Sequence, residues 1–382
     1  MNTDTKNRMT VPVIASEKNW IEGSALDQLN RSAKLPGVIA AAGMPDLQPG
    51  KDAPIGAVFA SDSHIYPHLV DKDIGCGLCL WQLNMRYGKI KTDKLEKRLD
   101  SRIEGPWDGD LAQYLKVEGI AATDFDQLSM GTIGYGNHFG ELSRVKEVFD
   151  SCRFAQLELD AKALFLLVHS GSRGYGESIL NAHASEYGTG GLNVGSKSAA
   201  NYLAAHDHAI LWASANRKLI ARRFMDALSA SGKQILDVSH NHVLPGQLNG
   251  SSCWIHRKGA VPLDQGPVVI AGSRGTLSYL VEATGDQKLN RNTAAHGAGR
   301  KWKRSDCRER LEKRYSATSL LKTEFGGKVI CEDKDLLFEE APQAYKDINI
   351  VIQDLLDAGV IRLIASFAPV VTYKKRRVNR ED

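Results

Sequence analysis

The 382-residue sequence lacks most of the features that mark secreted, membrane-spanning or fibrous proteins. Its six cysteines are unevenly spaced and do not form the pattern of a disulfide framework. The longest apolar run, near Leu164–Val168, is too short to cross a bilayer, and the first thirty residues contain no apolar signal core. We therefore predict a cytoplasmic protein without a membrane segment, whose cysteines are reduced and available as thiolates.

The rest of the composition is that of an ordinary folded protein. Hydrophobic residues make up 42% of the chain and charged residues 25%, which excludes a disordered chain and a collagen-like repeat. The net charge of +4 permits a polyanionic partner without requiring one. Because we find no internal repeat, linker or shift in composition, we predict a single domain over residues 1–382, with residues 1–10 and 375–382 as flexible tails.

Short apolar or alternating segments predict β-strands, and most of them run into clusters of Gly, Ser, Asn, Asp or His. The predicted strands are Gly56–Ala60, Cys79–Leu83, Leu164–His169, Gln234–Val238 and Val268–Ala271. Two longer segments, Ala199–Ala230 and Pro342–Ala358, predict helices. The pattern indicates a mixed α and β protein whose unusual residues lie at strand ends, where binding sites are commonly built.

Several potential metal ligands lie in turns or at strand ends rather than on helix faces. Asp73 and Cys76 share the segment D-I-G-C-G, while His138, His169 and His240 lie in other turns or at predicted strand ends. A lone histidine is more often structural. Several histidines together with a thiol and a carboxylate suit a divalent transition metal such as Mn, Zn, Fe or Co, and one bridging thiolate could hold two such ions.

The spacing of Cys76 and Cys79 is also that of a C-x-x-C motif, which occurs in zinc clips and redox pairs. The chain has no second C-x-x-C, and the context of a thioredoxin-like protein is missing. Cys79 begins a strand in which Cys79, Trp81 and Leu83 fall on one face, so we predict a core position for Cys79.

Three segments suit phosphate binding. In Asn292–Arg300, His296 is followed by two glycines, which allow close approach to the backbone, and by an arginine that can hold a phosphate. Imidazole is also a competent nucleophile toward phosphorus when a metal neutralises the phosphates. Gly272–Thr276 and Ser170–Gly174 present backbone N–H groups and an arginine, and tight turns with surface arginines explain them equally well.

Two other basic features have an ordinary explanation beside a functional one. Lys116–Gly119 resembles the lysine motif of ATP-dependent nucleotidyl-transfer ligases, but a four-residue match with Glu118 in place of Asp arises easily by chance. The basic residues Lys374–Arg377 and Arg380 predict either a solvated terminus or a tail that contacts phosphates.

Seven motifs occur in order between Asp73 and Ile348 and cover most of the chain. They are D-I-G-C-G, G-x-G-N-H-F-x-E, H-S-G-S-R-G, H-N, G-S-x-G-T-x-S-Y, H-G-A-G-R and A-Y-K-D-I. Together they resemble the RtcB family of GTP-dependent RNA ligases, of which this chain looks like a shorter, divergent paralogue. The resemblance implies a single α+β domain, with mixed sheets flanked by helices around a deep cleft that holds two Mn(II) ions and GTP.

The resemblance also implies roles for individual residues. The metal ligands would be Asp73, Cys76, His138, His169 and His240, with Cys76 bridging the two ions. His296 matches the histidine that becomes guanylylated. The GTP or phosphate contacts would be Asn137, Phe139, Glu141, Arg173, Asn241, Ser273, Ser278, Gly297, Ala298, Gly299, Arg300, Tyr345 and Lys374.

The implied reaction joins an RNA 2′,3′-cyclic phosphate or 3′-phosphate end to a 5′-hydroxyl end, in RNA repair or tRNA splicing. Guanylate would pass from His296 to the RNA 3′-phosphate, giving an RNA-ppG intermediate. The partners implied are such RNAs and GTP, with or without an accessory protein. The alternatives are a dinuclear metal phosphoesterase that acts on RNA ends and an RNA-binding protein without activity.

This sequence departs from the family pattern in ways that bear on substrate choice. Arg274 stands where many family members have Met in G-S-M-G. The segment Lys301–Arg304, after H-G-A-G-R, is more basic than the corresponding family segment. The proposed ligands and the nucleophile are all retained, so the departures predict a different RNA substrate rather than a loss of activity. The added basic residues predict salt-sensitive RNA binding.

Overall fold

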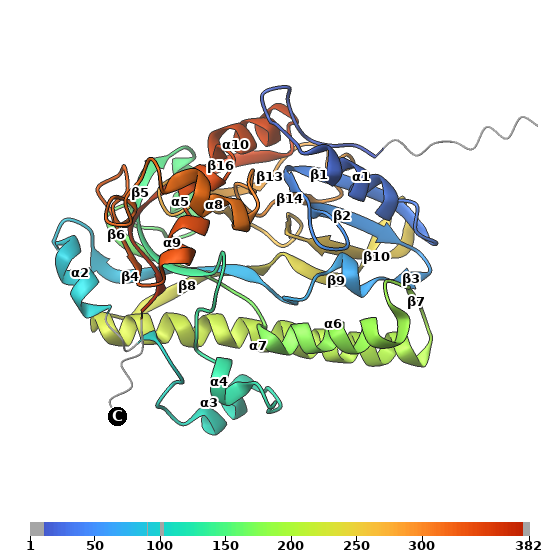
Figure 1. Cartoon of the computed structure of the whole chain (residues 1–382), viewed down its shortest axis with the longest axis horizontal. Coiled ribbons are helices and arrows are strands. Elements are labelled where there is room, and N and C mark those ends of the chain that lie inside the picture. The colour runs from blue at the N-terminus through green and yellow to red at the C-terminus, as the bar shows by residue number, and fades with distance from the viewer. Residues whose placement is uncertain (1–10, 90, 100–102, 377–382) are drawn as a thin grey trace, which may run out of the picture.

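A computed structural model of the protein describes residues 11–89, 91–99 and 103–376 and is drawn in Figure 1. The larger of its two main sheets is antiparallel except where β15 pairs parallel with β16. In spatial order its strands are β12 (Val268–Ile270), β13 (Ser278–Ala283), β16 (Ile361–Lys375), β5 (Phe139–Val148), β6 (Ala163–Ser170), β4 (Gly77–Arg86) and β8 (Gly232–Ser239), with β15 (Lys328–Cys331) beside β16.

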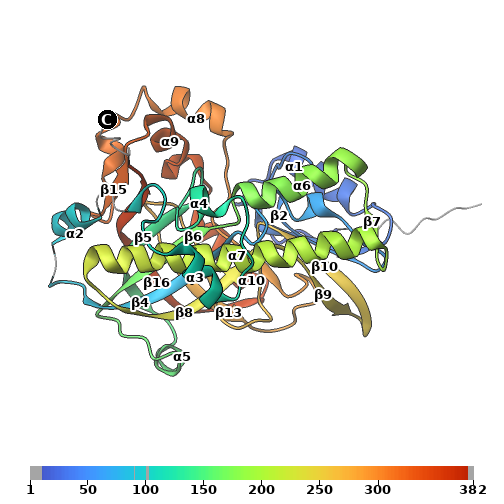
Figure 2. The ribbon, with the colours of Figure 1, turned by 90° about the horizontal axis from the view of Figure 1, so that it is seen from below.

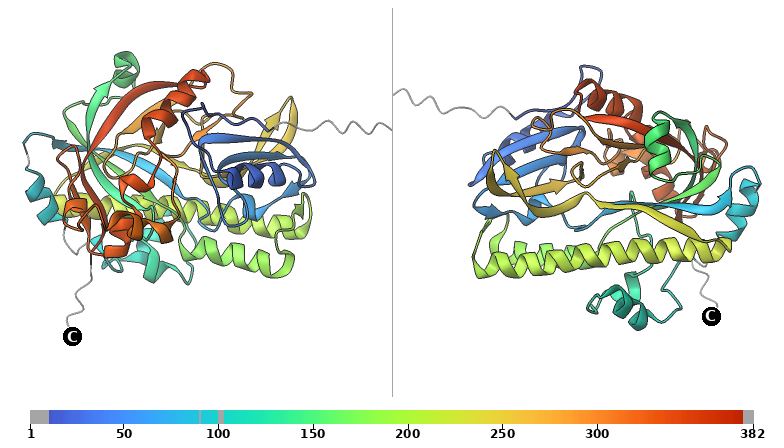
Figure 3. Two further views of the ribbon diagram at one scale, coloured as in Figure 1. Left: turned by 45° about the horizontal axis from the view of Figure 1, so that its top comes forward. Right: turned by 180° about the vertical axis from the view of Figure 1, so that it is seen from behind.

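The second sheet is antiparallel and has four strands. Their order is β1 (Val38–Gln48), β2 (Ile55–Ser61), β10 (Ser251–Lys258) and β9 (Asn241–Leu248). Two short ribbons complete the strands, namely β3 (His64–Ile65) with β7 (Leu192–Asn193) and β11 (Ala260–Pro262) with β14 (Thr293–Ala295). Figure 3 shows the two sheets side by side above the longest helix.

That helix, α7 (Lys197–Leu228), runs along the length of the molecule, as Figures 1 and 2 show. Its start is set by Ser196, whose side chain accepts a hydrogen bond from the backbone N–H of Ala199. Ile220 and Phe224 are fully buried in one core cluster with Leu164 and Leu166 of the large sheet, whereas Trp212 and Leu219 pack with Leu111 and Leu115 in another. The helix therefore braces the sheet strands from one side, and the prediction of a helix over 199–230 is confirmed.

The other helices are shorter, and the two over residues 111–118 and 126–129 lie on the far side of α7 from the sheets (Figure 1). They are α1 (Gly23–Ser32), α2 (Thr92–Arg98), α3 (Leu111–Glu118), α4 (Asp126–Ser129), α5 (Ser151–Gln156), α6 (Gly174–Tyr187), α8 (Arg304–Leu311), α9 (Lys334–Glu339) and α10 (Ile348–Asp357), with 3-10 turns η1 (Pro67–Leu69), η3 (Ser319–Leu321) and η4 (Pro342–Ala344). No helix in these described ranges is long and apolar enough to cross a membrane.

The predicted α+β class is confirmed, and all five predicted strands are present as β2, β4, β6, β8 and β12. The predicted helix over 342–358 is wrong in its first part. Only the turn η4 and then α10 form, and Tyr345 between them is extended. The reason is local, because the side chain of Asp347 accepts a hydrogen bond from the backbone N–H of Asn349 and so starts α10 there.

The basic residues near the C-terminus are partly built into the fold. Lys374 is buried in β16, and Lys375 pairs with Cys331 of β15. The backbone N–H of Arg376 donates to Glu104 at 2.8 Å. Of the predicted tails 1–10 and 375–382, the structure describes only Lys375, which ends β16, and Arg376, and the rest lies outside the described residues. Each of the six cysteines is a free thiol, and Cys79 is buried in the core as predicted.

The register of the large sheet brings the unusual strand ends to one edge. Gly77 at the start of β4 is paired with Ser170 at the end of β6 and with Ser239 at the end of β8. Phe139 at the start of β5 is paired with His169. Because these strands are antiparallel, the segments next to these ends must meet at the same edge of the sheet.

Candidate active site

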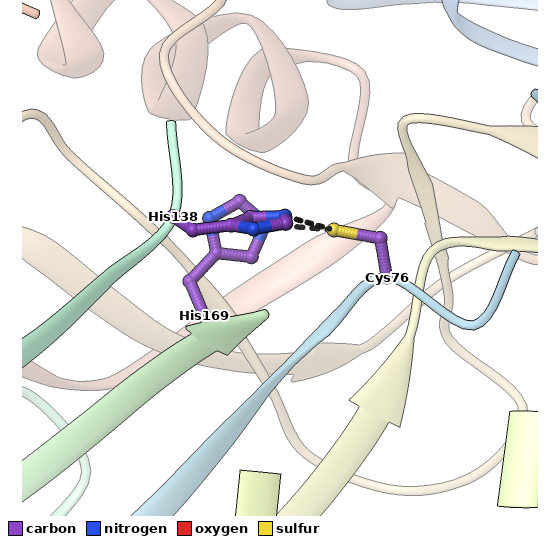
Figure 4. A group of neighbouring side chains, drawn as sticks. All are labelled: Cys76, His138 and His169. Carbon is purple, nitrogen blue, oxygen red and sulfur yellow. Dashed lines mark hydrogen bonds between the residues drawn. The ribbon is translucent and has the colours of Figure 1, made fainter. Parts of the chain in front are cut away.

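The five predicted metal ligands meet at this edge. The Sγ of Cys76 lies 3.3 Å from Nε2 of both His138 and His169, and Figure 4 shows the two rings converging on the sulfur. The Nε2 atoms of His169 and His240 are 3.3 Å apart, and Nε2 of His138 is 2.8 Å from an oxygen of Asp73. Asp73 and His240, the first and last of these donors, are more than 160 residues apart in the sequence, and the fold brings them together.

Neighbouring groups hold these side chains in place. Nδ1 of His169 lies 3.1 Å from the carbonyl oxygen of Asn137. Because a carbonyl oxygen can only accept a hydrogen bond, Nδ1 carries the proton. Nε2 of His169 therefore faces the sulfur of Cys76 with its lone pair. The backbone N–H of Arg173 donates to Asp73 at 2.9 Å. Gly171 lies directly against Asp73, and a Cβ there would be 2.3 Å from a carboxylate oxygen. These contacts fix the orientation of the donors before any ion binds.

Burial controls the charge of the cluster. It raises the pKa of the Cys76 thiol, and the carboxylate of Asp73 raises it further. Burial also lowers the pKa of His169 and His240, which favours neutral imidazoles. Burial alone would raise the pKa of Asp73, but His138 and Arg173 lower it to about 2. Neutral imidazoles, a carboxylate and a thiol that a cation would deprotonate fit a divalent transition metal. The ligand atoms of Cys76, His138 and His169 all lie within 4.8 Å of one another, close enough to hold one ion.

Helix α7 supports the cluster from behind. The buried guanidinium of Arg217 donates to the carbonyl oxygens of Gly75 at 2.6 Å and Ser170 at 2.9 Å, and to Asp237 at 2.6 Å. It therefore joins the two strand ends that carry Cys76 and His169. Asn241, predicted as a phosphate contact, has its amide bonded to the backbone of Gly259 at 2.7 Å and of Asp73 at 3.1 Å.

His296 lies between two cavities. One, the donor cavity, is lined by Asp73, Cys76, His138 and His240. The other, the inner cavity, is lined by most of the predicted nucleotide residues, and His296 lines both. These residues are Asn137, Phe139, Ser273, Gly297, Ala298, Gly299, Arg300, Tyr345 and Lys374.

A buried carboxylate that sequence reasoning missed holds His296. Oδ2 of Asp46 lies 2.6 Å from Nδ1 of His296 and also accepts its backbone N–H at 3.1 Å. The flanking carbonyl oxygens of Pro45 and Leu47 accept hydrogen bonds from Lys346 at 2.9 and 3.0 Å. Burial lowers the pKa of Lys346 to about 8. Lys346 belongs to the A-Y-K-D-I motif, and this motif is the one feature of the sequence that could have identified this part of the site.

Glu340, which the sequence analysis also missed, contacts the basic side chains that line the inner cavity. It accepts hydrogen bonds from Tyr345 at 2.5 Å and Arg300 at 3.1 Å and lies 3.5 Å from Lys374. Burial would raise its pKa, but Lys374 and Arg300 lower it to about 2. Arg300 also donates to the backbone oxygens of Trp302 and Glu339, so its guanidinium is fixed in place.

Two predicted nucleotide residues lie behind the cavity wall. Glu141 accepts hydrogen bonds from Thr372 at 2.6 Å and Ser143 at 3.0 Å, and Thr372 is the one that lines the cavity. Ser278 accepts the backbone N–H of Gly272 at 3.1 Å and so shapes the neighbouring turn.

Of the two predicted phosphate-binding arginines in turns, Arg274 is buried and Arg173 is half-buried. Arg274 is not a surface arginine, because it is 6% exposed, and one of its nitrogens donates to the carbonyl oxygen of Leu337 at 2.7 Å. Arg173 borders the donor cavity, with Nη1 3.0 Å from Nδ1 of His138. Gly134 is required there, because a Cβ would lie 0.8 Å from that guanidinium.

Comparison with known proteins agrees with the motifs over nearly the whole chain. The family model described as tRNA-splicing ligase RtcB matches residues 28–117 and 109–375. The chain belongs to the RtcB family of RNA ligases. This confirms the resemblance drawn from the seven motifs.

Three named relatives each match at least 90% of this chain. An Escherichia coli protein called RNA-splicing ligase RtcB2 is 47% identical over 365 residues, which is 94% of each chain. The RNA-splicing ligase RtcB of Mycobacterium tuberculosis is 28% identical over 433 residues, covering 90% of this chain and 99% of the relative. The tRNA-splicing ligase RtcB of Nanoarchaeum equitans is 28% identical over 465 residues, covering 97% and 96%.

Proposed function

We propose that this RtcB-family protein joins RNA 2′,3′-cyclic phosphate or 3′-phosphate ends to 5′-hydroxyl ends, using GTP and two Mn(II) ions, in RNA repair or tRNA splicing in the cytoplasm. The observation that carries the proposal is the position of His296. It is held by Asp46 at 2.6 Å and borders both the donor cavity and the inner cavity. A nucleophile in that position can reach a nucleotide whose phosphates lie against the donors.

The donors would hold the ions in two groups that share Cys76. Asp73 and His138, which lie 2.8 Å apart, would complete one site, and His169 and His240, which lie 3.3 Å apart, would complete the other. Bound there, divalent cations supply Lewis acidity and neutralise phosphate charge. The chain's own cations, Arg173 and Arg300, lie at the borders of the two cavities and can orient the phosphates.

In the first step, Nε2 of His296 attacks the α-phosphorus of GTP. A P–N bond forms, the bond to the bridging oxygen breaks, and pyrophosphate leaves. Asp46 accepts the hydrogen bond from Nδ1–H throughout and stabilises the positive charge that develops on the ring. The product is a histidine–GMP phosphoramidate.

In the second step, an oxygen of the RNA 3′-phosphate attacks this guanylate, the P–N bond breaks, and RNA-ppG forms. The 5′-hydroxyl of the second RNA then attacks the 3′-phosphate and expels GMP, with its proton passing to solvent. A 2′,3′-cyclic phosphate is first opened by water to a 3′-phosphate.

An assay with two RNA oligonucleotides tests this function. A 3′-phosphate strand and a 5′-hydroxyl strand, incubated with the protein, GTP and Mn(II), should give one joined product. His296→Ala should abolish joining, whereas His208→Asn, at a histidine of α7 that borders neither cavity, should not. Release of inorganic phosphate without joining would instead identify a metal phosphoesterase.

A further inference from the structure

We propose that a groove beside the donor cavity binds the single-stranded RNA that carries the 3′-phosphate. This outer groove is lined by Lys51, Lys72, Lys258, Trp302, Lys303 and Arg304, among others. The proposal rests on the ligase function above and identifies where one of its two RNA substrates lies.

The outer groove is continuous with the donor cavity. Five residues line both of them, namely Ile55, Asp71, Lys72, Glu177 and Arg304. Arg300 and Arg304 also line the inner cavity. An RNA strand in the groove could therefore place its end beside His296 while its upstream nucleotides remain outside.

The charge of the groove suits a polyanion. Seven Lys or Arg side chains and four carboxylates line it. Lys72 pairs with Glu177 at 3.2 Å, and Lys258 lies 3.7 Å from Asp71. Lys51 and Lys303 are exposed and form no ion pair with any residue in the described ranges. The excess positive charge is therefore available to RNA phosphates, which bind by releasing counterions.

Trp302 adds an aromatic surface to this basic groove. Its ring is half-buried, with Nζ of Lys301 at 5.2 Å and the guanidinium carbon of Arg310 at 5.3 Å from the ring centre. Nε of Arg300 donates to the carbonyl oxygen of Trp302 at 3.1 Å, which ties the tryptophan to the inner cavity. Cations interleaved with an aromatic ring are the usual surface for single-stranded nucleic acid.

The course of the proposed reaction favours the 3′-phosphate strand over the 5′-hydroxyl strand. Where the groove meets the donor cavity, Lys72 and Arg304 are balanced by Asp71 and Glu177, so the charge of this junction does not select between the two ends. The end that must reach His296 for guanylate transfer is the 3′-phosphate.

Charge reversal in the groove tests the proposal. The double variant Lys51→Glu/Lys303→Glu removes two of the three groove lysines that form no ion pair within the described ranges, the third being Lys301, and Trp302→Ala with Trp302→Phe tests the ring. The matched control is Lys146→Glu/Lys288→Glu, which makes the same change of charge at exposed lysines away from all three cavities. Fluorescence anisotropy gives the Kd of a labelled single-stranded 3′-phosphate RNA over a range of salt, and intact-mass spectrometry measures guanylylation without RNA.

We expect the groove variant to bind this RNA about tenfold more weakly than the control variant, with a salt dependence shallower by about 0.7 per lost phosphate contact. Trp302→Ala should also weaken binding, and Trp302→Phe should restore most of it. Retained guanylylation would show that the weak binders are folded. Equal RNA affinity in the groove and control variants would overturn the proposal, as would a loss confined to a 5′-hydroxyl strand. If the wild-type protein is not guanylylated, the ligase function fails, while the RNA affinities still decide whether the groove binds RNA.

Discussion

Among single residues, the proposed nucleophile His296 depends most on one partner, Asp46. Asp46 is fully buried and accepts both the ring Nδ1–H and the backbone N–H of His296. An acceptor on Nδ1 leaves the lone pair on Nε2, which is the atom that attacks phosphorus in the proposed reaction. Asp46 is thus a positioning residue that acts through the histidine.

Replacing Asp46 by Asn should therefore slow guanylylation more than it weakens GTP binding. The amide can present an N–H to Nδ1 and favour the wrong tautomer, so we expect a rate loss on the order of 100-fold, with a change in GTP Kd of less than about threefold. Single-turnover guanylylation and a separate binding titration measure the two effects. A variant as fast as the surface control Asp27→Asn would contradict the role of Asp46.

At the scale of secondary-structure elements, the pairing of β5 with β16 places a carboxylate in the core. Glu141 of β5 is the register partner of Thr372 of β16. Its carboxylate accepts hydrogen bonds from Thr372 and Ser143, but these two bonds do not compensate for the hydration that the carboxylate loses on burial. Burial raises the pKa of Glu141 from 4.5 to about 7. The ionised form is therefore disfavoured in the folded protein.

The effect on stability has a definite sign. A raised pKa means that the folded protein holds more protons than the unfolded chain between pH 4.5 and about 7, so Glu141 costs stability as the pH rises through this range. Glu141→Gln should be more stable than wild type by about 3 kcal/mol at about pH 8, and by nearly nothing at about pH 4.5. Urea unfolding at both pH values measures this. A difference that does not change with pH would contradict the buried carboxylate.

Elements could be predicted from sequence where their signals are local. The strands β4, β6 and β8 are apolar runs that end in polar turns, and α7 has an uninterrupted helical pattern with a serine cap. The helix predicted from Pro342 failed because Asp347 starts α10 later, and a cap inside an otherwise helical segment is easily overlooked.

The site could be predicted only in part, because only some of its residues have a local signal in the sequence. His296, Cys76 and the histidines have a chemistry that singles them out in any sequence. Asp46 is hydrogen-bonded to a histidine 250 residues away, and Lys346 donates to carbonyl groups about 300 residues away. Glu340 meets Arg300 across 40 residues. An ordinary acid or lysine acquires such a role only through tertiary packing, which no local pattern encodes.

At the scale of the whole molecule, two sheets and one long helix bring distant motifs to a single place. The donor cavity, the inner cavity and the outer groove adjoin one another, and His296 borders the first two. This arrangement suits the proposed reaction, in which a nucleotide, divalent cations and an RNA end meet at one imidazole.

Intact-mass spectrometry after incubation with GTP and Mn(II), followed by peptide mapping, tests this arrangement most directly. We expect the protein to gain the mass of one GMP on His296, the adduct to be acid-labile, and a chelator or His296→Ala to prevent its formation. Absence of an adduct in the metal-loaded wild-type protein, or an adduct on another residue such as Lys116, would show that His296 is not the nucleophile.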